Sequence, residues 1–114
     1  MFGIKKKTPE EKMEKLLKRG DWNALNEYAY DGKDSKITLA KVCEGSNDNS
    51  CIDILLRLLD DKDEDVIIAS ANALRVVGTD HVTAEIQQLL LKTPKENQKL
   101  RDVLSSTMQA LRTR

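Results

Sequence analysis

The chain consists of seven successive segments in which apolar residues recur with the period of an α-helix. In the clearest segment, residues 50–59, apolar residues occupy the i, i+3, i+4 and i+7 positions of one helix face. Those residues are Ile52, Leu55, Leu56 and Leu59. The other segments cover about residues 8–19, 21–30, 35–44, 66–77, 82–91 and 93–111. Almost no stretch alternates between apolar and polar residues as a strand does, so the pattern predicts an all-α fold of about seven helices.

Capping residues mark where several of these helices should begin and end. Residues 8–11, Thr-Pro-Glu-Glu, have the pattern of a helix N-terminus with a capping box, and Gly20 is a typical C-terminal stop. Residues 93–96, Thr-Pro-Lys-Glu, repeat the same pattern, so we expect the last helix to begin there. We expect the helix over residues 50–59 to begin at Ser50.

The helix predicted over residues 66–77 is rich in small side chains. It follows Asp63, which can cap its N-terminus, and it ends before Gly78. The small residues are Ala69, Ser70, Ala71 and Ala73. Small side chains let neighbouring helices approach closely on several sides. We therefore expect this helix to lie at the centre of the fold.

The last two predicted helices each have one apolar face. The residues expected to point inward are Val82, Ile86, Leu89 and Leu90 in the first, and Leu100, Val103, Leu104, Met108 and Leu111 in the second. Both helices should therefore pack against the rest of the fold through one face and present polar residues on the other.

The chain is also internally repeated, which is the signature of stacked structural units. A shift of 34 residues superposes residues 40–43 on 74–77 and residues 52–56 on 86–90, with apolar residues at matching positions. A longer shift, of 37 residues, superposes residues 73 and 74 on residues 110 and 111, so the last predicted helix matches the helix over residues 66–77. The repeated unit is a helical hairpin.

Residues 63–78, DEDVIIASANALRVVG, resemble the second helix of a HEAT repeat of the short bacterial and archaeal type, which also occurs in phycobilisome-lyase-like proteins. The matching positions are Asp63, Val66, Ala69, Ala71, Ala73, Leu74, Val77 and Gly78. Ile67 is a departure, because HEAT repeats usually carry an arginine there that joins a ladder between repeats. The resemblance implies an α-α superhelix, a HEAT-like solenoid of roughly three helical hairpins behind an N-terminal capping helix. A plain helical bundle is the alternative.

The repeat register also points to a candidate binding surface. Lys41, Arg75 and Arg112 fall at equivalent positions of the second helices of the hairpins, and the resemblance implies that these helices line the concave face where partners dock. The surface that we expect to bind a partner comprises Thr38, Lys41, Ile68, Asn72, Arg75, Ser105, Gln109 and Arg112. One cation per repeat would suit an anionic segment of a protein partner, with Ile68 as an apolar anchor.

The balance of charge along the chain argues against nucleic acid as a partner. The 114 residues include 19 Lys and Arg and 19 Asp and Glu, so the formal net charge is zero. The net charge is +4 over residues 1–20, −7 over residues 21–65 and +3 over residues 66–114. Because affinity for phosphates requires clustered cations, we do not expect nucleic-acid binding.

The length and the first residues predict one soluble unit. We expect residues 1–7 to form a flexible basic tail, too weakly apolar to anchor the chain to a membrane, and residues 8–114 to form a single domain. Cys43 and Cys51 are too few for a disulfide framework or a zinc site, and we expect both to be buried. We expect a cytoplasmic protein, because no stretch is long and apolar enough to span a membrane and the first residues are too quickly charged for a secretory signal. We expect a monomer, because the last helix carries polar residues on its outer face.

We expect neither catalysis nor a bound metal or cofactor. His81 is the only histidine, and local spacing places no carboxylate or nucleophile beside it. The aspartates within residues 61–65 match the opening of a calcium loop, but Val66 and Asn72 stand where that loop needs a glycine and a glutamate. The predicted function is a non-catalytic protein–protein interaction module or scaffold. The alternatives are a HEAT-like enzyme or accessory factor, similar to DNA glycosylases or to lyases and chaperones, and a small helical bundle that acts as an oligomerisation domain.

Overall fold

The computed structural model describes residues 8–113, and the basic tail predicted for residues 1–7 lies outside them. The helices are α1 (Pro9–Arg19), α2 (Trp22–Glu27), α3 (Lys33–Cys43), α4 (Asn49–Leu59), α5 (Glu64–Val77), α6 (Thr83–Lys92) and α7 (Gln98–Arg112). A short 3-10 helix, Tyr28–Tyr30, follows α2, and a second, Asp80–Val82, precedes α6. No strand occurs in the described part of the chain, so the prediction of an all-α fold of about seven helices is confirmed.

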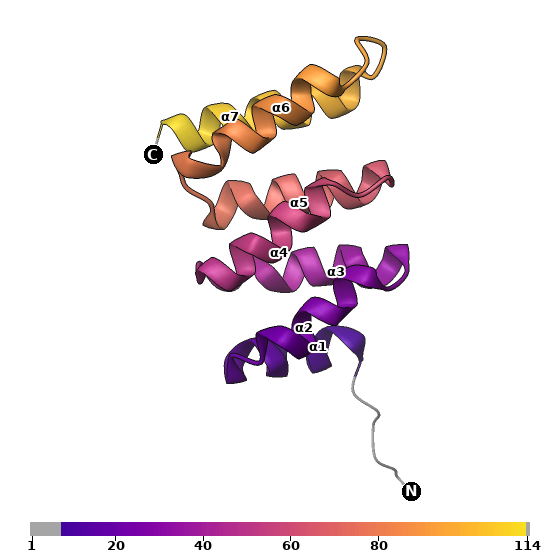
Figure 1. The fold of residues 1–114 in the computed structure, drawn as a ribbon, viewed down its shortest axis with the longest axis vertical. Helices are drawn as coiled ribbons and strands as arrows, with labels where there is room; N and C mark the ends of the chain where they lie inside the picture. Colours follow the sequence, from indigo (N-terminus) through magenta and orange to yellow (C-terminus); the bar gives the residue numbers. More distant parts are fainter. Residues whose placement is uncertain (1–7, 114) are drawn as a thin grey trace, which may run out of the picture.

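The helices form two layers, one in front of the other, and the helices of each layer follow one another along the long axis of the molecule (Figure 1). One layer contains α1, α3, α5 and α7, in which each helix packs against the next. The other layer contains α2, α4 and α6, which lie in front of the first layer in Figure 1. The described body measures 54 × 28 × 21 Å, so successive hairpins extend it in one direction.

Helix α5 lies at the centre, as its small residues predict. It packs against α3, α4 and α7. Ser70, Ala71 and Ala73 are completely buried, and the Ser70 hydroxyl donates a hydrogen bond to the backbone oxygen of Leu55 in α4. This hydrogen bond satisfies the buried hydroxyl, and the small side chain lets the two helices approach closely.

The helix positions match the 34-residue shift found in the sequence. Helices α3 and α5 end at Cys43 and Val77, and helices α4 and α6 begin at Asn49 and Thr83, so both intervals equal 34 residues. The hydrophobic pattern therefore located the repeated hairpin correctly.

Two predicted helix starts are wrong. Helix α4 is capped by Asp48, whose carboxylate accepts a hydrogen bond from the Ser50 amide, and not by Ser50 itself. Helix α7 is capped by Asn97, whose side-chain oxygen accepts from the Leu100 amide. Thr93 instead ends α6, because its hydroxyl donates to the backbone oxygen of Leu89 four residues earlier. The N-terminal start is confirmed, since Thr8 accepts a hydrogen bond from the Glu11 amide.

The predicted core faces of α4 and α6 are partly wrong. Of the four residues predicted for α4, only Leu55 and Leu59 are buried, whereas Ile52 and Leu56 are half-buried. The remaining buried residues of this helix are Cys51, Ile54 and Leu58. Helix α4 packs against α3 and α5, so its buried face is turned toward the first layer. Of the four residues predicted for the helix over residues 82–91, Val82, just before α6, and Ile86 are buried as predicted, but Leu89 and Leu90 are half-buried.

Candidate partner-binding surface

The eight residues predicted to bind a partner lie on the exposed sides of α3, α5 and α7, and we call them the inner surface. They are Thr38 and Lys41 on α3, Ile68, Asn72 and Arg75 on α5, and Ser105, Gln109 and Arg112 on α7. Thr38 and Ile68 are half-buried, and the other six are exposed. Because α5 packs against both α3 and α7, the three exposed stripes are neighbours across one layer.

The two arginines of the inner surface make contacts between helices. The Arg75 Nη1 atom donates to the Ser106 hydroxyl of α7 at 3.1 Å, which holds its guanidinium over the boundary between α5 and α7. The Arg112 Nη2 atom lies 3.5 Å from the Gln87 Oε1 atom of α6, so this guanidinium turns toward the other layer. Lys41 is exposed on α3. The three cations thus occupy successive helices of one layer, but the two guanidinium groups point in different directions.

The 34-residue shift aligns Val76 with Val42, and the structure places Val76 on the surface. Val76 is 53% exposed and follows Arg75 on α5. It lies four residues after Asn72 and eight after Ile68, so a helix places all three on the same side. The spacing from Ile68 and Asn72 could have identified Val76 as a surface residue from the sequence. Two apolar residues therefore lie on this side of α5, namely Ile68 of the inner surface and Val76 next to that surface.

The acidic run at residues 60–65 connects α4 to α5 and is tied to α3. The Lys36 Nζ atom lies 2.6 Å from the Asp61 Oδ1 atom, and the Lys33 Nζ atom lies 2.7 Å from the Asp65 Oδ2 atom. The second oxygen of Asp61 accepts a hydrogen bond from the Asp63 amide, and Asp63 in turn caps α5 through the Asp65 amide. The carboxylates that resemble a calcium loop therefore stabilise a turn and a helix start.

Asp61 and Lys36 form the least exposed of the ion pairs in the part of the chain that the structure describes. Their side chains are 15% and 21% exposed. Burial raises the pKa of Asp61, but the hydrogen bonds from Lys36 and from the Asp63 amide outweigh it and hold the pKa below its ordinary value.

Replacing Asp61 with asparagine should lower the free energy of unfolding at pH 7 by about 1 kcal/mol, because the charge-assisted hydrogen bond from Lys36 is lost. The pKa of Asp61 is lower in the folded chain than its unfolded value of about 3.9. Its contribution is therefore present above the unfolded value and is lost as the pH falls through the folded value. Urea titrations at neutral and acidic pH should show the difference between wild type and D61N shrinking in acid. A difference of the same size at both pH values would contradict this assignment.

The remaining chemically reactive side chains do not converge on a site. His81 is exposed in the 3-10 turn before α6, where its amide donates to the Thr79 hydroxyl. Cys43 and Cys51 are completely buried, as predicted, and contact each other through their thiols. The hydrogen bond to Cys51 and the burial both raise the pKa of the Cys43 thiol. Within residues 8–113, no group of three His, Cys, Asp or Glu side chains is arranged to hold a metal ion.

None of the helices in residues 8–113 is both long and apolar enough to cross a membrane. Comparison with protein-family models finds no match, and comparisons with curated proteins and with solved structures find no significant match.

Proposed function

We propose that this protein is a non-catalytic interaction module that binds an anionic segment of a protein partner on the inner surface. The observation that carries the proposal is the continuity of this surface. Three adjacent helices, α3, α5 and α7, present one basic residue each at repeat-equivalent positions, with Ile68 and Val76 exposed or half-buried between them. An apolar centre with charged surroundings is the usual composition of a transient protein interface.

The packing of the two layers supports this choice of face. Helices α3, α5 and α7 each contact the next helix of their layer, whereas α4 and α6 are separated by a groove. In a curved stack of hairpins, helices on the inside of the curve lie closer together than those on the outside. The HEAT-like stacking that we propose would therefore place the inner surface on the concave side, where a partner gains contacts from several helices at once.

Reversing the charge of Arg75 and Arg112 together should remove the partner in affinity capture from the source cells. The double variant R75E/R112E places two negative charges opposite the anionic segment, and juxtaposed like charges suppress association. Recovery of the partner by the wild-type protein should also fall as the salt concentration rises.

The control for this experiment is a double variant with the same change in net charge elsewhere. Lys92 and Lys95 are exposed near the end of α6 and in the loop after it, so K92E/K95E should leave recovery unchanged. Because Arg75 also hydrogen-bonds to Ser106, the fold of both variants must be checked. Circular dichroism should show that both keep their helices. Unchanged recovery by R75E/R112E would overturn the proposal, as would salt-sensitive binding of DNA in place of a protein.

A further inference from the structure

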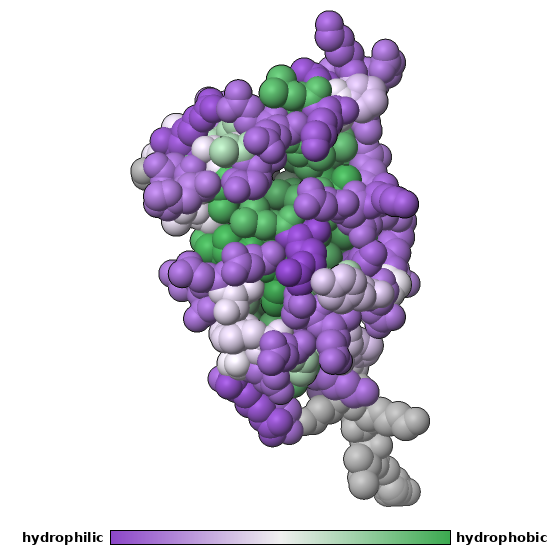
Figure 2. Space-filling view, in the orientation of Figure 1, coloured by the Kyte–Doolittle hydropathy of each residue, from purple (hydrophilic) through white to green (hydrophobic). Residues whose placement is uncertain are grey.

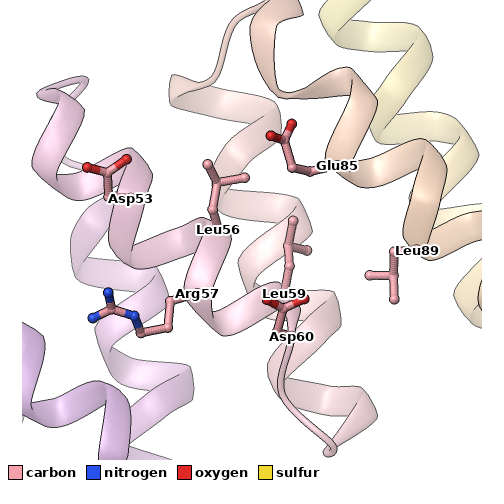
Figure 3. Close-up of a pocket in the computed structure, with 7 residues that line it drawn as sticks. All are labelled: Asp53, Leu56, Arg57, Leu59, Asp60, Glu85 and Leu89. Atoms are coloured by element: carbon pink, nitrogen blue, oxygen red, sulfur yellow. The ribbon is translucent and has the colours of Figure 1, made fainter.

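The space between α4 and α6 forms a groove on the opposite layer from the inner surface, in which leucines lie among charged residues. The groove has a volume of about 450 Å³. Leu59 forms its floor, and the half-buried Leu56 and Leu89 project into it from α4 and α6 (Figure 3). Figure 2 views the same layer and shows apolar residues gathered in its middle, surrounded by hydrophilic ones. We call this feature the outer groove.

The edge of the outer groove is acidic. Asp53 and Asp60 lie on the α4 side, and Glu85 points toward α4 from α6 (Figure 3). Among the ion pairs formed within residues 8–113, none involves these three carboxylates. They therefore differ from Asp61, Asp63 and Asp65, whose charges are paired with lysines of α3.

Arg57 is the one cation that lines the outer groove in the described part of the chain, and its charge is directed elsewhere. Its Nη1 atom donates to the Asn26 Oδ1 atom of α2 at 2.6 Å, and its guanidinium lies 5.8 Å from the centre of the Tyr30 ring. Figure 3 shows the guanidinium pointing away from Leu89. The groove thus presents an apolar floor between three carboxylates that lack a basic partner within the described residues.

From this complementarity we propose that the outer groove binds an amphipathic helix of a second protein, with leucine-like residues on one face and Lys or Arg beside them. The apolar face would cover Leu56 and Leu89, and the cations would pair with Asp53, Asp60 and Glu85. The stretch of α4 from Asp53 to Asp60 spans about 10 Å, which matches roughly two helical turns of a ligand. A helix laid between two helices is a common mode of peptide recognition, in which anchors recur at i, i+3 or i+4, and i+7.

This ligand is distinct from the partner proposed for the inner surface. It has the opposite charge and lies against the opposite layer, so the two sites can be occupied at the same time. The failure of either proposal leaves the other standing, because Arg75 and Arg112, and the Ser106 and Gln87 side chains to which they donate, do not line the outer groove.

The test uses a designed peptide and the full chain. The probe is an end-capped peptide of about twelve residues with leucines at i, i+3, i+4 and i+7 and lysines at the other positions. A second peptide of the same composition, with its leucines spread around the helix, controls for general electrostatic attraction. NMR titration should show shifts concentrated at Leu56, Leu59 and Leu89 with the first peptide and little change with the second.

Two variants locate the site. The double variant D53K/E85K should weaken binding of the first peptide by about tenfold or more, because a like charge then faces each lysine. The matched control E10K/E14K makes the same change in net charge on two exposed residues of α1 and should bind as the wild type does. The variant L56A should also weaken binding, since it removes an apolar contact without changing any charge.

Three results would overturn the proposal. The first is equal binding of the peptide by the wild type, D53K/E85K and E10K/E14K. The second is a set of shifts that lies outside α4 and α6. The third is occupation of the groove by this chain itself, detected either as a concentration-dependent dimer that L56A abolishes or as groove shifts caused by deleting residues 1–7.

Discussion

Replacing Leu74 with alanine should lower the free energy of unfolding by about 3 to 4 kcal/mol. Leu74 is completely buried in α5, and α5 packs against α3, α4 and α7 at once. The cost of such a truncation combines the lost transfer free energy of the side chain with the cavity that remains. Because α5 is held between several helices, little of the cavity can be closed by the movement of one of them.

The control for this prediction is the same substitution at an exposed leucine. Leu91 is 78% exposed on α6, so L91A should change stability by no more than about 0.5 kcal/mol. Equilibrium urea unfolding, followed by circular dichroism, measures both values. A domain of this size is stabilised by only about 5 to 15 kcal/mol, so L74A should lower the urea concentration at the unfolding midpoint by a large fraction of its wild-type value. Equal stability of L74A and L91A would contradict the central position of α5.

Replacing Gly78 with alanine should cost about 2 kcal/mol, although the backbone there is one that any residue adopts. The φ angle of Gly78 is −76°, so the reason for a glycine is space and not a left-handed conformation. A Cβ atom at this position would lie 2.6 Å from the Leu74 backbone oxygen and 3.4 Å from Leu111 Cδ2. Relief of such an overlap requires the turn after α5 to move away from the Leu74 carbonyl, and overpacking of this kind typically costs about 1 to 3 kcal/mol.

Gly32 provides the matched control, because a Cβ atom there would meet no atom within 4 Å. It precedes α3 with a φ angle of −69°, so G32A should change stability by no more than about 0.5 kcal/mol. Thermal unfolding of G78A and G32A compares the two positions directly. Equal melting temperatures would show that the contact between Gly78 and the α5 carbonyl is not a constraint on packing.

The sequence predicted the number of helices and the position of α5 because these features depend on local patterns. Small residues at 69–73 allow close approach of several neighbours whatever the rest of the chain does, and α5 contacts three helices. The 34-residue shift likewise reflects side chains that repeat at fixed helical spacing. Gly78 shows the limit of this reasoning, since the helix does end there, but the lack of space for a Cβ atom is visible only in the packed structure.

The helix starts and exposed faces were harder to predict because they depend on competition and on neighbours. Asp48 and Ser50 can both cap a helix, and the turn before α4 places the Asp48 carboxylate against the Ser50 amide. Thr93 can begin one helix or end another, and its hydroxyl bonds to the backbone of α6. The apolar pattern of α4 includes Leu56, although no helix within residues 8–113 covers that side completely. Periodicity identifies an apolar residue but not the element that buries it.

The same limit applies to the inner surface. The repeat register correctly placed its eight residues on adjacent helices, since helix spacing follows from the hairpin period. It could not predict that the Arg112 guanidinium turns toward Gln87, because that contact joins two layers through flexible side chains.

Site-specific photo-crosslinking from the inner surface tests the proposed function most directly. A photoreactive residue at Asn72, which is exposed at the middle of α5, is compared in the source cells with the same residue at Glu96, which is exposed in the loop before α7. The account predicts a protein adduct from position 72, none from position 96, and loss of the adduct when R75E/R112E is combined with the probe. Equal adducts from both positions, or an adduct from position 72 that survives the charge reversal, would contradict it.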